Sequence, residues 1–91
     1  MLELEQTKQF KKCLKKYRHK KAVLGELKKV VALLVNNKPI PQKYRDRELT
    51  GNYRGIRELH VKSDELLLYI RVQHKKITLM ALGGHSKLFK K

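Results

Sequence analysis

Three short apolar segments follow one another closely in the second half of the chain, and they constrain the fold more than any other feature. They cover residues 56–61, 66–72 and 76–82, and each has the length of a β-strand. Turn-forming stretches at residues 62–64 and 73–75 separate them, and the second is short enough for a tight hairpin. Because such short connections join antiparallel neighbours, the pattern predicts a small, mostly antiparallel sheet.

The first half of the chain has the spacing of two helices. Thr7 can cap a helix that begins at Lys8 and places Phe10, Leu14 and Tyr17 on one face. A second helix follows, in which apolar residues recur at the helical period and predict a core helix: Val23, Leu27, Val30, Val31 and Leu34. Asparagines and prolines then end the helical pattern.

The expected fold is α+β in the order β-α-α-β-β-β, with a two-helix layer packed on one face of the sheet. Leu2 and Leu4 alternate with glutamates and predict the first strand. With 91 residues, the chain is expected to be a single domain spanning residues 1–91. Because only one helical layer is available, we expect the second sheet face to be an open, polar groove. Residues 85–89 are expected to form a short tail.

The strongest compositional feature is positive charge, since 23 lysines and arginines oppose 8 acidic residues and give a formal net charge of +15. A partner that offsets such self-repulsion must be polyanionic or strongly acidic. A phosphate backbone fits best, because cations displace its condensed counterions, and an acidic protein partner also fits. A membrane fits less well, because tryptophan is absent and the basic residues are spread through the sequence.

Several basic and aromatic residues are candidates for contact with RNA. Four lysines are neighbours on the polar side of the first helix, where they form either a solvated face or an RNA-binding surface: Lys8, Lys11, Lys12 and Lys15. Tyr44, Tyr53 and Phe89 can stack on bases, as single-stranded RNA sites often require. Tyr69 lies within an apolar strand and is expected in the core.

Cysteine and histidine usage argues against a metal centre. The single cysteine, Cys13, excludes an internal disulfide framework, and together with the lack of a signal-peptide pattern it predicts a cytoplasmic location. The histidines at positions 19, 60, 74 and 85 lack the paired spacing of zinc ligands, and no phosphate-binding glycine loop is present. We therefore expect no metal and no cofactor. His60 and His85 each end a predicted strand, and each alone is either structural or catalytic.

Four stretches of the C-terminal half, taken together, carry a specific signal. They are residues 44–51 (YRDRELTG), residues 52–60 (NYRGIRELH), Asp64, and residues 84–89 (GHSKLF). In order, spacing and position this set resembles the YafQ branch of the RelE/ParE toxin superfamily. The N-terminal half matches that branch only in its β-α-α order and its basic character.

The resemblance implies a toxin of a type II toxin-antitoxin system, a ribosome-dependent mRNA endoribonuclease neutralised by a cognate acidic antitoxin. Operator DNA is then bound only through the antitoxin complex. In the family, the residues matching His60, Asp64, His85 and Phe89 are implicated in cleavage, and the residue matching Arg57 in phosphate contact. Arg54, within the second stretch, is expected to contact RNA.

Two positions depart from the family's pattern. The family commonly has a histidine where this chain has Arg47, and many members have an arginine where this chain has Ala81. The fold and the class of activity survive both changes, but the division of catalytic roles stays open.

Such cleavage needs no metal, because RNA carries its own nucleophile in the 2′-hydroxyl. The enzyme takes that proton, steadies the phosphate and protonates the leaving 5′-oxygen. Histidine suits the proton transfers, since its unperturbed pKa of ~6.5 lies near working pH. The hypothesis is that His60, assisted by Asp64, is the base and His85 the acid, or the reverse.

The planar fork of arginine suits the phosphate, so Arg57 and Arg47 are assigned to hold it, while Phe89 packs against a base. Arg57 and His60 have opposite strand parity, however. They share a face only if His60 lies past the strand end or a bulge intervenes.

Two alternatives of another class remain: a non-catalytic basic nucleic-acid-binding module, and a ParE-like toxin that poisons a topoisomerase. Neither needs the histidines.

Overall fold

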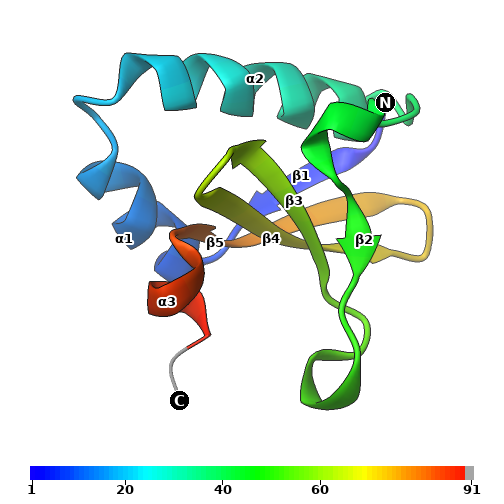
Figure 1. Cartoon of the computed structure of the whole chain (residues 1–91). Helices are drawn as coiled ribbons and strands as arrows, with labels where there is room; N and C mark the ends of the chain where they lie inside the picture. The colour runs from blue at the N-terminus through cyan, green and yellow to red at the C-terminus, as the bar shows by residue number, and fades with distance from the viewer. Residues whose placement is uncertain (90–91) are drawn as a thin grey trace.

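The computed structural model describes residues 1–89 as a five-stranded sheet with two longer helices, α1 and α2, and a short third helix (Figure 1). The strands are β1 (Glu3–Gln6), β2 (Arg47–Glu48), β3 (Arg57–Lys62), β4 (Glu65–Val72) and β5 (Lys76–Gly83). The helices are α1 (Lys8–Lys16), α2 (Lys21–Val35) and α3 (His85–Leu88), with 3-10 turns at Gln42–Tyr44 and Gly51–Tyr53. The predicted α+β fold is confirmed.

The sheet has the order β1-β5-β4-β3-β2, in which β1 runs parallel to β5 and the other neighbours are antiparallel. Local interactions explain the turn between β4 and β5 and the start of α1. Gln73 and His74 form the predicted hairpin turn with φ of 48° and 58°, the left-handed values that match the twist of paired strands. Thr7 caps α1 as predicted, because its Oγ1 accepts a hydrogen bond from the Phe10 N–H at 3.0 Å. The same hydroxyl donates to the Met80 carbonyl at 3.0 Å and ties α1 to β5.

Two elements, β2 and α3, were not predicted. β2 has only two residues and depends on pairing with β3, where Arg47 lies opposite Glu58. Residues 85–89 were expected as a tail, but most of them form α3. The turn closes because the Gly84 carbonyl accepts from the N–H groups of Lys87 and Leu88, each at 3.1 Å. Leu88 then packs over Gly83, where any added Cβ would lie 3.4 Å from its side chain.

Cross-strand partners divide the sheet into two faces, because paired residues point the same way. Leu59, Leu67 and Leu82 form one such row and are no more than 2% exposed. They belong to the core that the sheet forms with α1 and α2, to which Phe10, Val30 and Leu34 also contribute. Tyr69 lies in this core as predicted.

The second face bears Glu58, His60, Leu66, Leu68 and Ala81, and is called the open face below. It has no layer of long helices, as expected, but it is less polar than expected. Leu66 is 1% exposed, and Leu68 and Ala81 are each 8% exposed, so its floor is apolar. Of the five residues named here, the two polar ones, Glu58 and His60, both lie on β3. Among residues 1–89, no helix is long and apolar enough to cross a bilayer.

Candidate active site on the open face

The short strand β2 brings Arg47 onto the open face. Arg47 is the cross-strand partner of Glu58, and the row continues through Leu68 to Ala81. His60 lies two residues further along β3, in the next row with Leu66 and Gly83. The structure therefore collects Arg47 and His60 from the predicted site residues, and it adds Glu58 between them.

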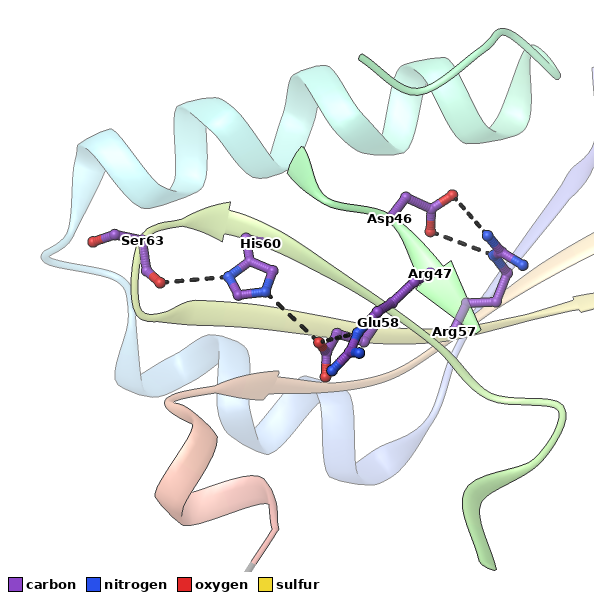
Figure 2. Close-up of polar contacts among 6 residues, drawn as sticks. All are labelled: Asp46, Arg47, Arg57, Glu58, His60 and Ser63. Atoms are coloured by element: carbon purple, nitrogen blue, oxygen red, sulfur yellow. Dashed lines mark hydrogen bonds and ion pairs between the residues drawn. The ribbon is translucent and has the colours of Figure 1, made fainter. Parts of the chain in front are cut away.

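These three side chains are in direct polar contact (Figure 2). Arg47 Nε donates to Glu58 Oε1 at 3.2 Å, and His60 Nε2 lies 3.6 Å from the same oxygen. On its other side, His60 Nδ1 lies 3.4 Å from the carbonyl oxygen of Ser63, in the turn that leads to β4. The imidazole is thus held between the turn and the Glu58 carboxylate, with 23% of the side chain exposed.

Sequence reasoning missed Glu58. This residue is only 2% exposed, and within residues 1–89 its Oε2 has no hydrogen-bond partner. Strand alternation alone places Glu58 on the face of His60, two residues away, so parity was the signal that could have identified it.

Arg57 lies on the opposite face of the sheet, the covered face that packs against α1 and α2, and is not brought to His60. β3 is regular from Arg57 through His60, and the register shift comes only after His60, so the opposite parity holds. Arg57 Nε and Nη2 donate to Asp46 Oδ1 and Oδ2 at 3.4 and 3.2 Å, as Figure 2 shows. Burial lowers the pKa of Arg57, but its hydrogen bonds to Asp46 and Tyr69 outweigh that effect and raise it. The Arg57 guanidinium therefore holds a structural carboxylate in this structure.

Tyr69 completes this second cluster. Its hydroxyl donates to Asp46 Oδ1 at 2.6 Å. Burial, followed by the Asp46 carboxylate, raises the pKa of Tyr69 well above its usual range, so the hydroxyl stays protonated and keeps donating.

The β3–β4 turn and α3 bring Asp64 next to the residue that precedes His85. A Cβ on Gly84 would lie 3.6 Å from the Asp64 carbonyl oxygen and 3.8 Å from its Oδ2. α3 also folds the His85 ring against Phe89, with ring centroids 4.9 Å apart. The ring of Tyr53 meets Phe89 edge-on at 5.3 Å, although it comes from the loop after β2. An aromatic group of His85, Phe89 and Tyr53 results.

Comparison with known proteins settles the family. The family model described as the bacterial toxin of type II toxin-antitoxin systems, YafQ, matches residues 2–90. The chain belongs to the YafQ toxin family. It is 32% identical over 88 residues to the mRNA interferase toxin YafQ of Escherichia coli K12, covering 96% of this chain and 95% of that protein.

Solved structures of related toxins have the same fold. YafQ from E. coli BL21(DE3) superimposes with a TM-score of 0.87 at 30% identity, over 98% of this chain and 99% of that one. A metal-bound toxin from Helicobacter pylori gives 0.88 at 39% identity, over 98% and 100%. YafQ in the E. coli DinJ-YafQ complex gives 0.86 at 31% identity, over 98% and 99%.

The other residues of this YafQ-family chain that were predicted to contact RNA differ in their exposure. The four lysines of the basic helix, with Arg54, are exposed: Lys8, Lys11, Lys12 and Lys15. That helix packs against the core, away from the open face. The stacking role assigned to Tyr44 is wrong, because Tyr44 is 4% exposed and its hydroxyl donates to Glu26 Oε1 at 2.7 Å. Tyr53, at 42% exposed, is available.

The donor set of the open face is small. No group of three or more His, Cys, Asp or Glu side chains suited to a metal ion occurs in the part of the chain that the structure describes. Arg47 and His60 both contact Glu58 Oε1, so a positively charged guanidinium already lies against this carboxylate.

Proposed function

We propose that this chain is a ribosome-dependent endoribonuclease toxin that cleaves mRNA through the RNA 2′-hydroxyl, without a metal, and that a cognate antitoxin neutralises it. The observation that carries the proposal is the joining of Arg47 and His60 on the one sheet face that no long helix covers, in a chain of the YafQ family. Curated E. coli relatives are named mRNA interferase toxins, which supports an RNA substrate.

The roles follow from what each group can do. His60 and His85 share the two proton transfers, one taking the 2′-proton and the other protonating the leaving 5′-oxygen. Arg47 supplies fixed positive charge to the phosphate as it gains negative charge in the transition state. Asp64 assists through its place beside Gly84, which precedes His85.

The aromatic group binds the RNA base. Phe89 and Tyr53 present ring edges and faces from two separate elements, and base stacking on such rings tolerates different sequences. Arg57, initially assigned to the phosphate, instead supports Asp46 and the start of β2 from the covered face. Its role in the proposal is therefore to hold the residue next to Arg47.

The partners follow from charge and from the relatives. The E. coli YafQ structures with DinJ show a toxin of this fold bound to its antitoxin. Because this chain has a net charge of +15, its antitoxin is expected to be acidic where it binds. Operator DNA is contacted only through that complex. The ribosome places the site of action in the cytoplasm.

The test joins growth arrest to the chemistry of the product. The chain is expressed with and without its upstream neighbouring gene, and mRNA ends are mapped in arrested cells. Purified protein is then added to programmed ribosomes, where cuts within codons should leave a 2′,3′-cyclic or 3′-phosphate end. His60→Ala and His85→Ala should lose cleavage, and His74→Ala, which changes an exposed turn histidine, should keep it.

Two results contradict the proposal. A 3′-hydroxyl end would exclude the 2′-hydroxyl as nucleophile. Undiminished toxicity of both histidine variants would instead point to a non-catalytic nucleic-acid binder or a topoisomerase poison.

A further inference from the structure

A basic hollow lies next to His60, on the side of the ring that faces away from Arg47. It has a volume of about 390 Å³ and is formed by α2, residues 42–45, the end of β3 and the β3–β4 turn: Glu26, Lys43, Tyr44, Arg45, His60, Val61, Lys62 and Ser63. His60 Nε2 lies 3.6 Å from Glu58 Oε1, whereas Nδ1 lies 3.4 Å from the Ser63 carbonyl oxygen. The imidazole therefore separates this basic hollow from the Arg47–Glu58 pair (Figure 2).

Three side chains of the basic hollow are cations without a carboxylate partner. Lys43, Arg45 and Lys62 are exposed, and none of them forms an ion pair with an acidic group in residues 1–89. Glu26, the acid among the lining residues, is engaged on both oxygens, because Oε1 accepts from Tyr44 at 2.7 Å and Oε2 lies 3.5 Å from Lys29 Nζ. The hollow thus has an excess of positive charge, which favours an anion.

The backbone fixes the place of two of these cations. Tyr44 is 4% exposed, and its hydroxyl anchors residues 42–45 to Glu26 of α2. The Arg45 N–H donates to the Gln42 carbonyl at 3.0 Å, and Arg45 has φ of 50° and ψ of 45°, in the left-handed region. Residues with a Cβ seldom adopt this conformation, and it persists where surrounding contacts hold it. Lys43 and Arg45, on either side of the buried Tyr44, are therefore presented to the hollow by a fixed turn.

The chemistry of the hollow fits a backbone phosphate better than a base. Ammonium and guanidinium groups bind phosphate oxygens by charge-assisted hydrogen bonds. The aromatic ring in the lining, that of Tyr44, is buried, and Lys43 Nζ lies over it at 5.0 Å from the ring centroid. A base therefore has no open ring to stack on here. If Arg47 and His60 act on one phosphate of an RNA strand, a neighbouring phosphate of that strand can reach the cations on the other side of His60.

We propose that the basic hollow is an RNA subsite that binds the mRNA phosphate adjoining the cleaved bond. This inference rests on the proposed function, in which Arg47 and His60 act on the cleaved phosphate. Contacts to backbone phosphates position a nucleic acid without reading its sequence. The subsite adds affinity and fixes which bond lies at His60, and Lys43, Arg45 and Lys62 take no part in proton transfer.

The test combines a neutral linkage in the mRNA with a neutralised hollow. Programmed ribosomes carry mRNA in which the phosphate before or after the cleaved bond is replaced by an uncharged methylphosphonate. The measured quantity is the toxin concentration that gives half-maximal single-turnover cleavage. With the wild-type chain, one of the two replacements should raise this concentration by about tenfold, the combined effect of the exposed ion pairs that the phosphate forms.

Lys43→Gln/Lys62→Gln should already need a higher concentration on the ordinary mRNA. In this variant the same neutral linkage should raise the concentration by about threefold or less, because Arg45 alone remains to pair with the phosphate. The saturated rate should equal that of the wild type, since the substitutions remove binding and leave the reacting groups in place. Because the effect of the linkage is a ratio of two measurements on one variant, a lower folded fraction cannot imitate its loss.

Lys21→Gln/Lys75→Gln is the matched control. It removes the same charge from two exposed lysines, one at the start of α2 and one in the β4–β5 turn. Both lie outside the basic hollow, and neither forms an ion pair within the part of the chain that the structure describes. This variant should keep the full effect of the neutral linkage.

A full effect of the neutral linkage in Lys43→Gln/Lys62→Gln overturns the proposal. If that variant also needs more protein on the ordinary mRNA, the hollow binds ribosomal RNA instead, and if it behaves as wild type, its lysines form a solvated surface. A wild-type chain that tolerates both neutral linkages overturns the proposal as well. Failure of the wild-type chain to cleave the ordinary mRNA overturns the proposed function itself, which separates the two conclusions.

Discussion

At the scale of single residues, the two departures from the family's pattern lie in one row of the sheet. Arg47 is paired with Glu58, and the row continues through Leu68 to Ala81. An arginine cannot exchange protons near neutral pH, but it can hold fixed charge against a phosphate. We propose that Arg47, at the opposite end of this row, supplies the charge that members of the family often place at the position of Ala81.

Arg47→Ala should slow the saturated cleavage rate by ~10²-fold, comparable to the loss of one donor to transition-state charge. The measurement is single-turnover cleavage on programmed ribosomes at saturating protein. Arg54→Ala is the control, because loss of an exposed RNA contact should weaken binding and leave the saturated rate unchanged. An Arg47→Ala rate equal to wild type would reduce Arg47 to such a contact.

His85→Ala should abolish toxicity while the affinity for the antitoxin stays within about tenfold, ~1.4 kcal/mol. Charge complementarity is spread over many lysines and arginines, whereas proton transfer depends on one ring. Growth arrest and a binding titration with purified antitoxin measure the two properties separately. Growth arrest as strong as that of wild type would show that His85 is not catalytic.

At the scale of elements, sequence periodicity predicted the long helices and strands and failed to predict the short ones. The helical repeat of Val23, Leu27 and Val30 and the apolar runs of β3 to β5 are long enough to define a period. β2 has two residues and α3 has four, so neither can show one. β2 depends on its pairing with β3, and α3 depends on the packing of Leu88 on Gly83, and neither interaction produces a periodic pattern in the sequence.

The same limit explains the errors at the site. Tyr44 looked available because it lies in a polar stretch, but a 3-10 turn directs it to Glu26 of α2. The opposite parity of Arg57 and His60 was visible in the sequence, and the structure shows that no bulge removes it between them. Glu58 was overlooked because one acidic residue among basic neighbours is usually a solvated surface group.

The Asp46 cluster holds the start of β2, so Asp46→Ala should cost about 2 kcal/mol of unfolding free energy. The substitution leaves the Tyr69 hydroxyl and the Arg57 guanidinium without their acceptor in a largely buried place. Urea denaturation measures the change. Glu48→Ala, on the exposed strand next to it, should change the stability by less than about 0.5 kcal/mol. Equal effects of the two substitutions would contradict a structural role for the cluster.

At the scale of the whole molecule, charge and chemistry occupy different regions. The net charge of +15 is spread over the chain, and the basic side of α1 points away from the core while the open face lies on the other side of the sheet. Composition could predict a polyanionic partner, but it could not tell which surface cuts and which only binds.

Replacing Lys8, Lys11, Lys12 and Lys15 together by glutamine should weaken ribosome binding and leave the saturated cleavage rate unchanged. For every lysine that binds a phosphate, its replacement should reduce the slope of log affinity against log salt by about 1. Binding titrations at several salt concentrations provide the slope. An unchanged slope would mean that these lysines form a solvated face, and a reduced saturated rate would place them at the site of cleavage.

Asp46 and Arg47 are neighbours in the chain that are anchored on opposite sides of the sheet, one to Arg57 and Tyr69, the other to Glu58. The start of β2 is thus held by side-chain contacts on both faces of the sheet. A hollow of about 390 Å³ opens beside it, lined by Asp46, Arg57 and Arg71 among others. A small molecule that separated Asp46 from Arg57 there should loosen Arg47 from outside the open face, so an inhibitor of the proposed cleavage need not compete with RNA for that face.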